Sequence, residues 1–358
     1  MINIFNIRPK GLNVGNDAIF VAMRHYIYKA FGNMVNIIEL PATKRYESGA
    51  IAGLSSKSIY EMNRSGHGVI VGGGNLYENG EIDIDTEALK ALDIPLMVYS
   101  VSRGRIFNKK KELVDRTDVI SDSKLKAISQ AADFNHVRDI ATAKYIQELN
   151  VKNVDVGACP TLFLGKYINF SIEEKYIKKY ISDKVVISIR NPSLMSIPAS
   201  YQQQVRDDIN NIIEYSKNVL NKETVILCHD LRDIDYAESI SCDHLYTADI
   251  YTYLTIIKFA HLLISYRLHS FLPAISYRKD AIKISYDERA LSLIETLSLD
   301  KWNINMLEEN VMDAVIDRIN NMDRLKNIIT ANEENWNNID TNIENQFTEF
   351  ANLVKRNA

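Results

Sequence analysis

The chain has 358 residues, 46% of them hydrophobic, and a soluble chain of this length usually forms more than one core, so we expect two domains. With 42 basic and 46 acidic residues, its formal net charge of −4 excludes a global field that would hold nucleic acid or an anionic membrane. No apolar run approaches the roughly 20 residues that span a bilayer. The first residues resemble a strand followed by glycine rather than a signal peptide, so we expect a cytoplasmic protein.

Cysteine and histidine spacing argues against several kinds of site. The cysteines Cys159, Cys228 and Cys242 are odd in number and form no C-x-x-C pair, which predicts reduced thiols rather than disulfides or a zinc site. The seven histidines show no H-x-x-x-H spacing, and no G-x-S-x-G segment offers a nucleophilic serine. We therefore expect neither a metal nor a resident cofactor.

Short β-branched runs alternate along the chain with segments of helical period, which predicts repeated βα units on parallel sheets. The expected strands are INIFNI, NIIEL, GVIVGG, PLMVYSV, HVRD, VDVGACPTLFL, VVISIR, TVILCH, HLYT, HLLISY and AIKISY. A quieter, lysine-rich stretch at 166–184 suggests the boundary between a domain over 1–170 and a second one over 180–300.

Strands are expected to stop after about Leu297, and residues 301–358 are expected to be helical. The helical period of the tail predicts one apolar face that packs back on the N-terminal half. Its members are Trp336, Ile339, Ile343, Phe347, Phe350 and Leu353.

Two glycine-containing loops follow predicted strands. In Gly11-Leu-Asn-Val-Gly-Asn-Asp17, the helix is expected to begin around Ala18, and Asp17 either caps it or faces a cleft. In the second loop, Gly73 and Gly74 free the backbone to lie against a ligand, and Asn75 offers a donor and an acceptor. A tight turn explains the same glycines, and the loop is neither a G-x-G-x-x-G fingerprint nor a P-loop.

Three arginines stand at strand ends, the edge at which open α/β sheets bind ligands. They are Arg138, Arg190 and Arg267, and their planar guanidinium groups suit phosphate and carboxylate. For Arg138, a structural ion pair with Asp139 is the alternative.

The segment Arg267-Leu268-His269-Ser follows an apolar strand, so arginine and histidine project from one turn and predict a binding site. His229 and Asp230 form a weaker parallel at another strand end, which helix capping explains equally well.

A basic cluster, Arg103, Arg105 and residues 109–111, is expected to be a solvated loop, with contact to an anionic lipid surface as the alternative. Peripheral contact with a membrane is therefore left open, and the sequence indicates no particular oligomeric state.

Several of these segments, taken together and in order, resemble the polysaccharide pyruvyltransferase family. They are NVGND, GVIVGGGNL, HVRD, VDVGACPTLFL, VVISIR and HLLISYRLHSFLPAISY. The resemblance implies two Rossmann-like domains in a GT-B-like arrangement, phosphoenolpyruvate as donor, and a sugar or lipid-linked oligosaccharide as acceptor. It places the family's functional positions on Asp17, Arg138, Arg267 and His269, with Arg190 as a further donor contact.

The chain departs from this family at two points. Many relatives have a lysine in a YDPK-like segment, where this chain has Tyr286-Asp-Glu-Arg289, so Arg289 either replaces that cation or the role is lost. Relatives also often carry a DPA-like acidic element where this chain has Ala-Cys159-Pro-Thr.

The resemblance implies an enzyme that forms a pyruvyl ketal on a bacterial surface polysaccharide precursor and releases phosphate, and the absence of metal-ligand spacing predicts that it needs no metal. His269 is the expected acid, Arg267 and Arg190 the clamps on donor charge, and Arg138 and Asp17 the positioning groups. The alternatives are a GT-B glycosyltransferase that uses a nucleotide sugar and a catalytically inactive glycan-binding member of the family.

Overall fold

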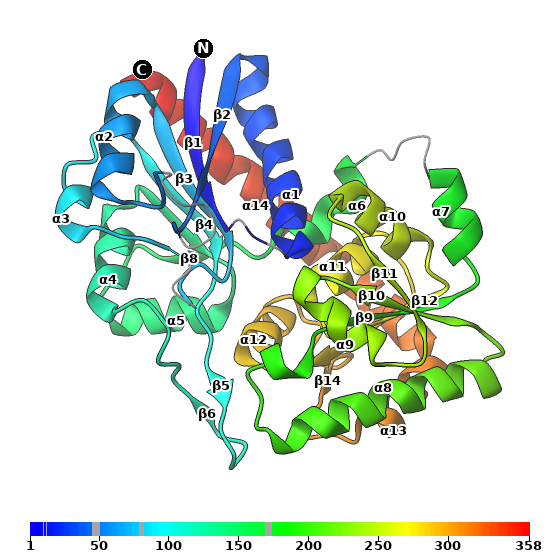
Figure 1. Cartoon of the computed structure of the whole chain (residues 1–358). Helices are drawn as coiled ribbons and strands as arrows, with labels where there is room; N and C mark the ends of the chain where they lie inside the picture. The colour runs from blue at the N-terminus through cyan, green and yellow to red at the C-terminus, as the bar shows by residue number, and fades with distance from the viewer. Residues whose placement is uncertain (10, 12, 45–50, 79–81, 169–173) are drawn as a thin grey trace.

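The computed structural model describes residues 1–9, 11, 13–44, 51–78, 82–168 and 174–358. These residues form two six-stranded parallel sheets, which lie in two halves placed side by side (Figure 1). The first sheet has the order β2 (Val35–Pro41), β1 (Ile2–Arg8), β3 (Gly68–Gly74), β4 (Leu96–Val101), β7 (Phe134–Val137) and β8 (Asp155–Val156). The second has the order β11 (Asp243–Tyr246), β10 (Thr224–Cys228), β9 (Val185–Ile189), β12 (Leu262–Ser265), β13 (Ala281–Ser285) and β14 (Ile304–Asn305).

Helices follow most strands and cover both faces of the sheets, so that the central strands are buried, apolar runs. Many of them begin at an Asn, Ser or Asp whose side chain accepts an N–H of the first turn, which fixes where the helix starts. Within the described ranges, no helix is long and apolar enough to cross a membrane. The helices are α1 (Val14–Phe31), α2 (Ser56–Ser65), α3 (Thr86–Leu89), α4 (Asp122–Ala131), α5 (Ile140–Glu148), α6 (Leu164–Tyr167), α7 (Glu174–Ile181), α8 (Ser200–Asn218), α9 (Ile234–Glu238), α10 (Ile250–Phe259), α11 (Leu268–Ser276), α12 (Glu288–Thr296), α13 (Val311–Asn320) and α14 (Met322–Asn357).

The α/β fold class is confirmed, but the structure corrects several details of the prediction. Strands do not stop at Leu297, because β14 completes the second sheet beside β13. Helix α1 begins at Val14 rather than near Ala18, since Asn13 is its N-cap. The run from Val154 to Leu164 contributes only β8, after which Pro160 begins a 3₁₀ turn. An antiparallel hairpin, β5 (Ile106–Phe107) and β6 (Leu113–Val114), was not predicted, and the expected domain boundary at residue 170 lies outside the described residues.

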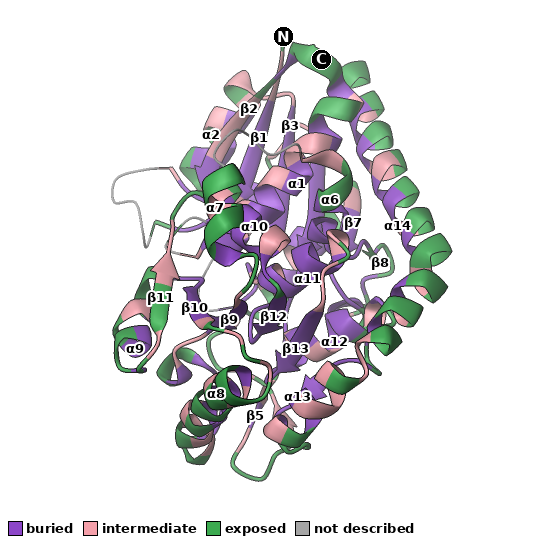
Figure 2. Ribbon diagram, turned by 90° about the vertical axis from the view of Figure 1, so that its right-hand side faces the viewer, coloured by how far each residue is buried: buried purple, intermediate pink, exposed green. Residues whose placement is uncertain are grey.

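The C-terminal helix α14 joins the two halves. Phe347 lies against Tyr26 and Tyr99 of the first half, at ring-centre distances of 5.7 and 5.1 Å. At the other end of the helix, the indole of Trp336 donates to the carbonyl of Leu297 in the second half, at 3.1 Å. Buried and exposed residues alternate along α14 (Figure 2), as its helical period predicted. Leu353, expected on the apolar face, is half-buried, and Val354 is buried instead.

Removing the Tyr26 hydroxyl tests how much α14 contributes to stability. The Tyr26 hydroxyl donates to Asp340 of α14 at 2.6 Å, and both residues are buried. Tyr26→Phe is therefore expected to lower the free energy of unfolding by about 1.5 kcal/mol, since Asp340 keeps its bonds from Lys166 and Tyr167. Urea unfolding, with the exposed Tyr60→Phe as control, measures the difference; equal values for both variants would contradict this role.

Candidate active site

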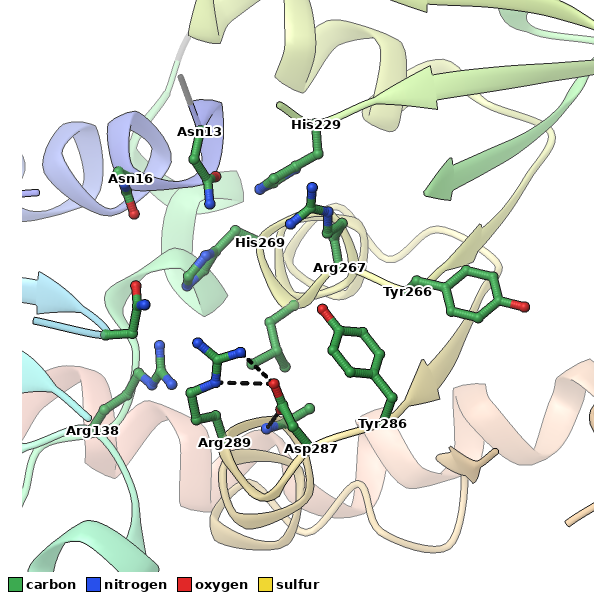
Figure 3. A pocket seen from close by; sticks show the side chains of 13 residues that line it. Asn13, Asn16, Arg138, His229, Tyr266, Arg267, His269, Tyr286, Asp287 and Arg289 are labelled. Atoms are coloured by element: carbon green, nitrogen blue, oxygen red, sulfur yellow. Dashed lines mark hydrogen bonds and ion pairs between the residues drawn. The ribbon is translucent and has the colours of Figure 1, made fainter. Parts of the chain in front are cut away.

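A cavity that is partly open to solvent lies where the carboxyl ends of the two sheets face each other. Figure 3 shows that side chains from both halves point into it. Ligands of open α/β sheets bind at this edge, which makes the cavity the candidate site. It is lined by Asn13, Asn16, Asn75, Arg138, His229, Tyr266, Arg267, Leu268, His269, Tyr286, Asp287, Arg289 and Ala290.

The triple-glycine loop places one amide at the cavity. Gly73 and Gly74 have φ angles of 81° and 80°, and a Cβ on Gly73 would lie 2.3 Å from the side chain of Ile19 in α1. Glycine is therefore required for β3 and α1 to approach this closely. Neither glycine lines the cavity, whereas the next residue, Asn75, does. The loop thus positions Asn75 rather than contributing a glycine to the cavity wall.

Arg138 is a buried cation with few partners. It follows β7, its side chain is 3% exposed, and its nearest carboxylate, Asp139, lies 3.7 Å from Nε. The Asp139 carboxylate accepts instead from Thr142 at the start of α5 and from Ser292 of α12. No described residue accepts a hydrogen bond from the Arg138 guanidinium. A buried, unsatisfied guanidinium at a cavity is a strong attractor for an anion.

Arg267 is held by the second half but keeps one donor free. Its Nε donates to the carbonyl of Ile189 at 2.8 Å, and its Nη2 pairs with the buried Asp233. Its Nη1 donates to none of the described residues. Arg190 does not line the cavity; it lies behind Arg267, where it pairs with Asp230 at 3.2 Å and Asp233 at 3.8 Å. Burial and the neighbouring Arg267 lower the pKa of Arg190 to about 10.

His269 stands in the first turn of α11, among these cations. Its Nε2 is buried and has no hydrogen-bond partner in the described part of the chain. Burial, followed by the charges of Arg138, Arg267 and Arg289, lowers the pKa of His269 to about 3, so these surroundings keep the imidazole neutral at pH 7.

His229, which the sequence left undecided between lining the cleft and capping, lines the same cavity. It follows β10 and is buried, and burial is the main cause of a pKa well below the ordinary range. A Cβ on Gly15 would lie 2.4 Å from Nε2 of His229 and 2.9 Å from Cβ of His269. The first turn of α1 therefore packs directly onto the two histidines.

Arg289 lines the cavity with its guanidinium between two carboxylates. Its Nε and Nη2 bind Asp287, and its Nη1 lies 3.0 Å from the buried Glu78 of the first half. Burial raises the pKa of Glu78 to about 7, although Arg289 and Arg116 oppose that shift. All three nitrogens of Arg289 thus face carboxylates, unlike those of Arg138.

Asp17 lies outside the cavity lining. Its carboxylate pairs with Arg8 at 2.7 Å, and the cap of α1 is supplied by Asn13, which accepts from Gly15 N–H. Of the two roles expected for Asp17, capping is therefore wrong, and its carboxylate is not among the groups that line the cavity. Asn13 and Asn16, which line the cavity, belong to the same N-V-G-N-D segment; their carboxamides were the signal that could have identified them.

The basic cluster does not form one solvated surface. Arg103 is buried, pairs with Asp115 at 3.0 Å and lies over the Tyr145 ring. Arg105 pairs with Glu288 of the second half at 2.5 Å, so it bridges the two halves. The remaining members of the cluster, the three lysines at 109–111, lie on the turn between β5 and β6.

No group of three or more His, Cys, Asp or Glu side chains arranged to hold a metal ion occurs among the described residues.

Two parallel, Rossmann-like sheets that meet at a basic cavity define a GT-B-like protein, and solved structures agree. A co-structure of S. aureus MnaA with UDP superimposes with a TM-score of 0.59 at 14% identity, over 92% of this chain and 90% of that one. A putative UDP-N-acetylglucosamine 2-epimerase from Listeria monocytogenes gives 0.59 at 10% identity, with the same coverage. The UDP-GlcNAc 2-epimerase of Neisseria meningitidis, bound to UDP-GlcNAc, gives 0.53 at 10% identity, over 90% and 100%. At these identities the likeness shows the fold alone.

The family is shown by sequence. The model of the family described as polysaccharide pyruvyl transferase matches residues 13–288, more than half of the chain and every cavity-lining residue except Arg289 and Ala290. The chain belongs to this family. A search of curated protein sequences found no match.

Proposed function

We propose that the chain transfers the pyruvyl group of phosphoenolpyruvate onto two hydroxyls of a sugar in a surface polysaccharide precursor, forming a ketal and releasing phosphate. The observation that carries the proposal is the buried guanidinium of Arg138, which no described acceptor satisfies, together with the free Nη1 of Arg267 in the lining of the same cavity. Phosphoenolpyruvate has a carboxylate and a phosphate, so it offers an anionic group to each cation. Membership of the family supports the same assignment.

The reaction adds one proton to a carbon of phosphoenolpyruvate and removes one proton from each of the two sugar hydroxyls. Protonated His269 gives its proton to the methylene carbon C3, which becomes methyl, while a sugar hydroxyl bonds to C2. The bond from C2 to the phosphate oxygen then breaks, and the second hydroxyl bonds to C2. Of the two hydroxyl protons, one restores His269 and one leaves with phosphate. The carboxamides of Asn13, Asn16 and Asn75, on the wall contributed by the first half, are the proposed contacts of the sugar.

Donor binding and turnover test this function separately. Calorimetry should show phosphoenolpyruvate binding, and [2-¹³C]phosphoenolpyruvate incubated with a panel of methyl hexopyranosides should yield a ketal carbon in the NMR spectrum together with free phosphate. We expect turnover to persist in EDTA, as the histidine spacing suggests. Absence of phosphoenolpyruvate binding would refute the proposal; loss of turnover in EDTA, restored by a divalent ion, would refute its metal-free form.

A nucleotide-sugar enzyme is the second candidate, because the similar structures above include UDP-GlcNAc 2-epimerases and a protein solved with UDP. The same arginines would then bind a diphosphate. UDP and UDP-GlcNAc, run beside phosphoenolpyruvate in a thermal-shift series, separate the two candidates. Stabilisation by UDP-GlcNAc alone would favour the second.

A further inference from the structure

His229 ends a buried chain of hydroxyl groups that comes from three elements of the second half. Its Nδ1 lies 2.6 Å from the hydroxyl of Tyr253 in α10, which lies 2.6 Å from that of Ser270 in α11. Ser270 lies 2.7 Å from Ser188 of β9, and Ser188 returns to Tyr253 at 3.4 Å. All four residues are buried, so these contacts have no water to replace them.

Two arrangements of the protons fit this network, and they differ in the state of the imidazole. If the three hydroxyl protons run round the triangle of Tyr253, Ser270 and Ser188, its three contacts are filled, and Nδ1–H of His229 donates to the tyrosine oxygen, which leaves Nε2 with a lone pair. If the tyrosine donates to Nδ1 instead, the contacts of 2.6 and 2.7 Å are filled, Nε2 carries the proton, and the 3.4 Å contact between Ser188 and Tyr253 is left without one. Only the first arrangement fills every contact of the buried network.

In that arrangement the unprotonated Nε2 belongs to His229, a side chain that lines the cavity. Figure 3 shows the His229 ring directed at the space between Asn13 and His269. The ring is fixed in place, because the His229 carbonyl accepts the N–H of Val14 at 3.1 Å and Gly15 packs against its edge. Burial, followed by the charges of Arg267, of His269 when it is protonated, and of Arg190, disfavours a proton on His229, and Asp230 is paired with Arg190 and Arg232. The two histidines therefore offer different groups to a ligand. The Nε2 of His269 lies among cations and has no hydrogen-bond partner in the described structure, whereas the Nε2 of His229 is a hydrogen-bond acceptor whose position is fixed.

We propose that His229 is the general base of the reaction, whose Nε2 removes the proton of the first sugar hydroxyl, and that Tyr253 and Ser270 are positioning residues that set its tautomer. The inference rests on the proposed function. In the first step, the hydroxyl proton moves to Nε2 as oxygen bonds to C2 and His269 protonates C3. In the second step, His269 takes the proton of the second hydroxyl, and His229 gives its proton to the departing phosphate. Both imidazoles return to their initial states.

The tautomer can be read without any ligand. Long-range ¹H–¹⁵N NMR of histidine-labelled protein, with the His229→Gln spectrum to assign the signal, should show His229 as the Nδ1–H form. In Tyr253→Phe that pattern should be lost, and Ser270→Ala gives a second disruption should Tyr253→Phe fail to fold. Tyr236→Phe is the matched control, since its hydroxyl is buried and has no hydrogen-bond partner among the described residues. A wild-type spectrum of the Nε2–H form would overturn the proposal.

Turnover on the hexoside panel then separates base chemistry from structure. His229→Gln should lower kcat by about 10²–10⁴-fold with the dissociation constant of phosphoenolpyruvate within about twofold of wild type. Tyr253→Phe should lower kcat by roughly tenfold with the same donor affinity, and Tyr236→Phe should change neither. Wild-type kcat in His229→Gln would overturn the proposal. If the wild-type protein does not bind phosphoenolpyruvate, the proposed function is refuted. The NMR measurement of the His229 tautomer needs no donor, so it would still test the hydrogen-bond network.

Discussion

Replacing His269 by glutamine is expected to lower kcat by about 10²–10⁴-fold while phosphoenolpyruvate affinity at high pH and thermal stability stay close to wild type. Glutamine keeps a hydrogen-bonding head group but cannot deliver a proton to C3. The Nε2 of His269 has no hydrogen-bond partner in the described structure, so the substitution breaks no existing bond at that atom. The measurement is kcat at saturating donor together with the melting temperature of the same preparation. A variant with wild-type kcat would exclude the acid role, and a lowered melting temperature with intact specific activity would indicate a structural residue.

Donor binding should protonate this histidine. In the empty site, burial and three arginines lower the pKa of His269 to about 3, so at pH 7 it has no proton to give. The charge of phosphoenolpyruvate offsets those arginines and raises the pKa of His269 in the complex. The complex then holds more protons than the free protein between the two pKa values, so donor affinity falls as pH rises through that window. Calorimetry in buffers of different ionisation enthalpy should show proton uptake in the wild type and a clear reduction in His269→Gln. Equal proton uptake in the wild type and in His269→Gln would show that a group other than His269 takes up the proton.

Most strands were predictable along the chain because the central parallel strands are buried on both faces and therefore form continuous apolar runs. β14 was missed since it has only two residues, Ile304 and Asn305, too few to give a periodic signal. The hairpin β5–β6 was missed for the same reason. Asn13 was not chosen as the start of α1, although Asn is a favoured N-cap, because Asp17 in the same segment offered a competing cap.

The site residues that follow directly after a strand could be predicted from the sequence. The ion pairs and hydrogen bonds between residues far apart in the sequence could not. Arg138 follows a strand of the first sheet, Arg267 and His269 follow a strand of the second, and the carboxyl edges of the two sheets meet at one cavity. In contrast, the pairing of Asp17 with Arg8 and that of Arg289 with Glu78 join residues whose proximity only the folded chain establishes. The same holds for the network behind His229, whose members come from β9, α10 and α11.

Arg138 and Arg289 both line the cavity, but only Arg138 is expected to carry donor affinity. Arg138→Gln should weaken phosphoenolpyruvate binding by about 1.5–3 kcal/mol, because it removes a charge-assisted contact. It should cost little stability, since Asp139 keeps its bonds from Thr142 and Ser292.

Arg289→Lys, which restores the cation type that many relatives are expected to have, should change donor affinity by less than about 1 kcal/mol. Its charge already faces Asp287 and Glu78, so the positive charge of the guanidinium is compensated before the donor binds. Calorimetric titration of both variants with phosphoenolpyruvate, at a fixed pH, compares them directly. Equal losses would show that Arg289 leaves its carboxylates to bind the donor. A loss confined to Arg289→Lys would move the anion site from the first half, at Arg138, to the start of α12.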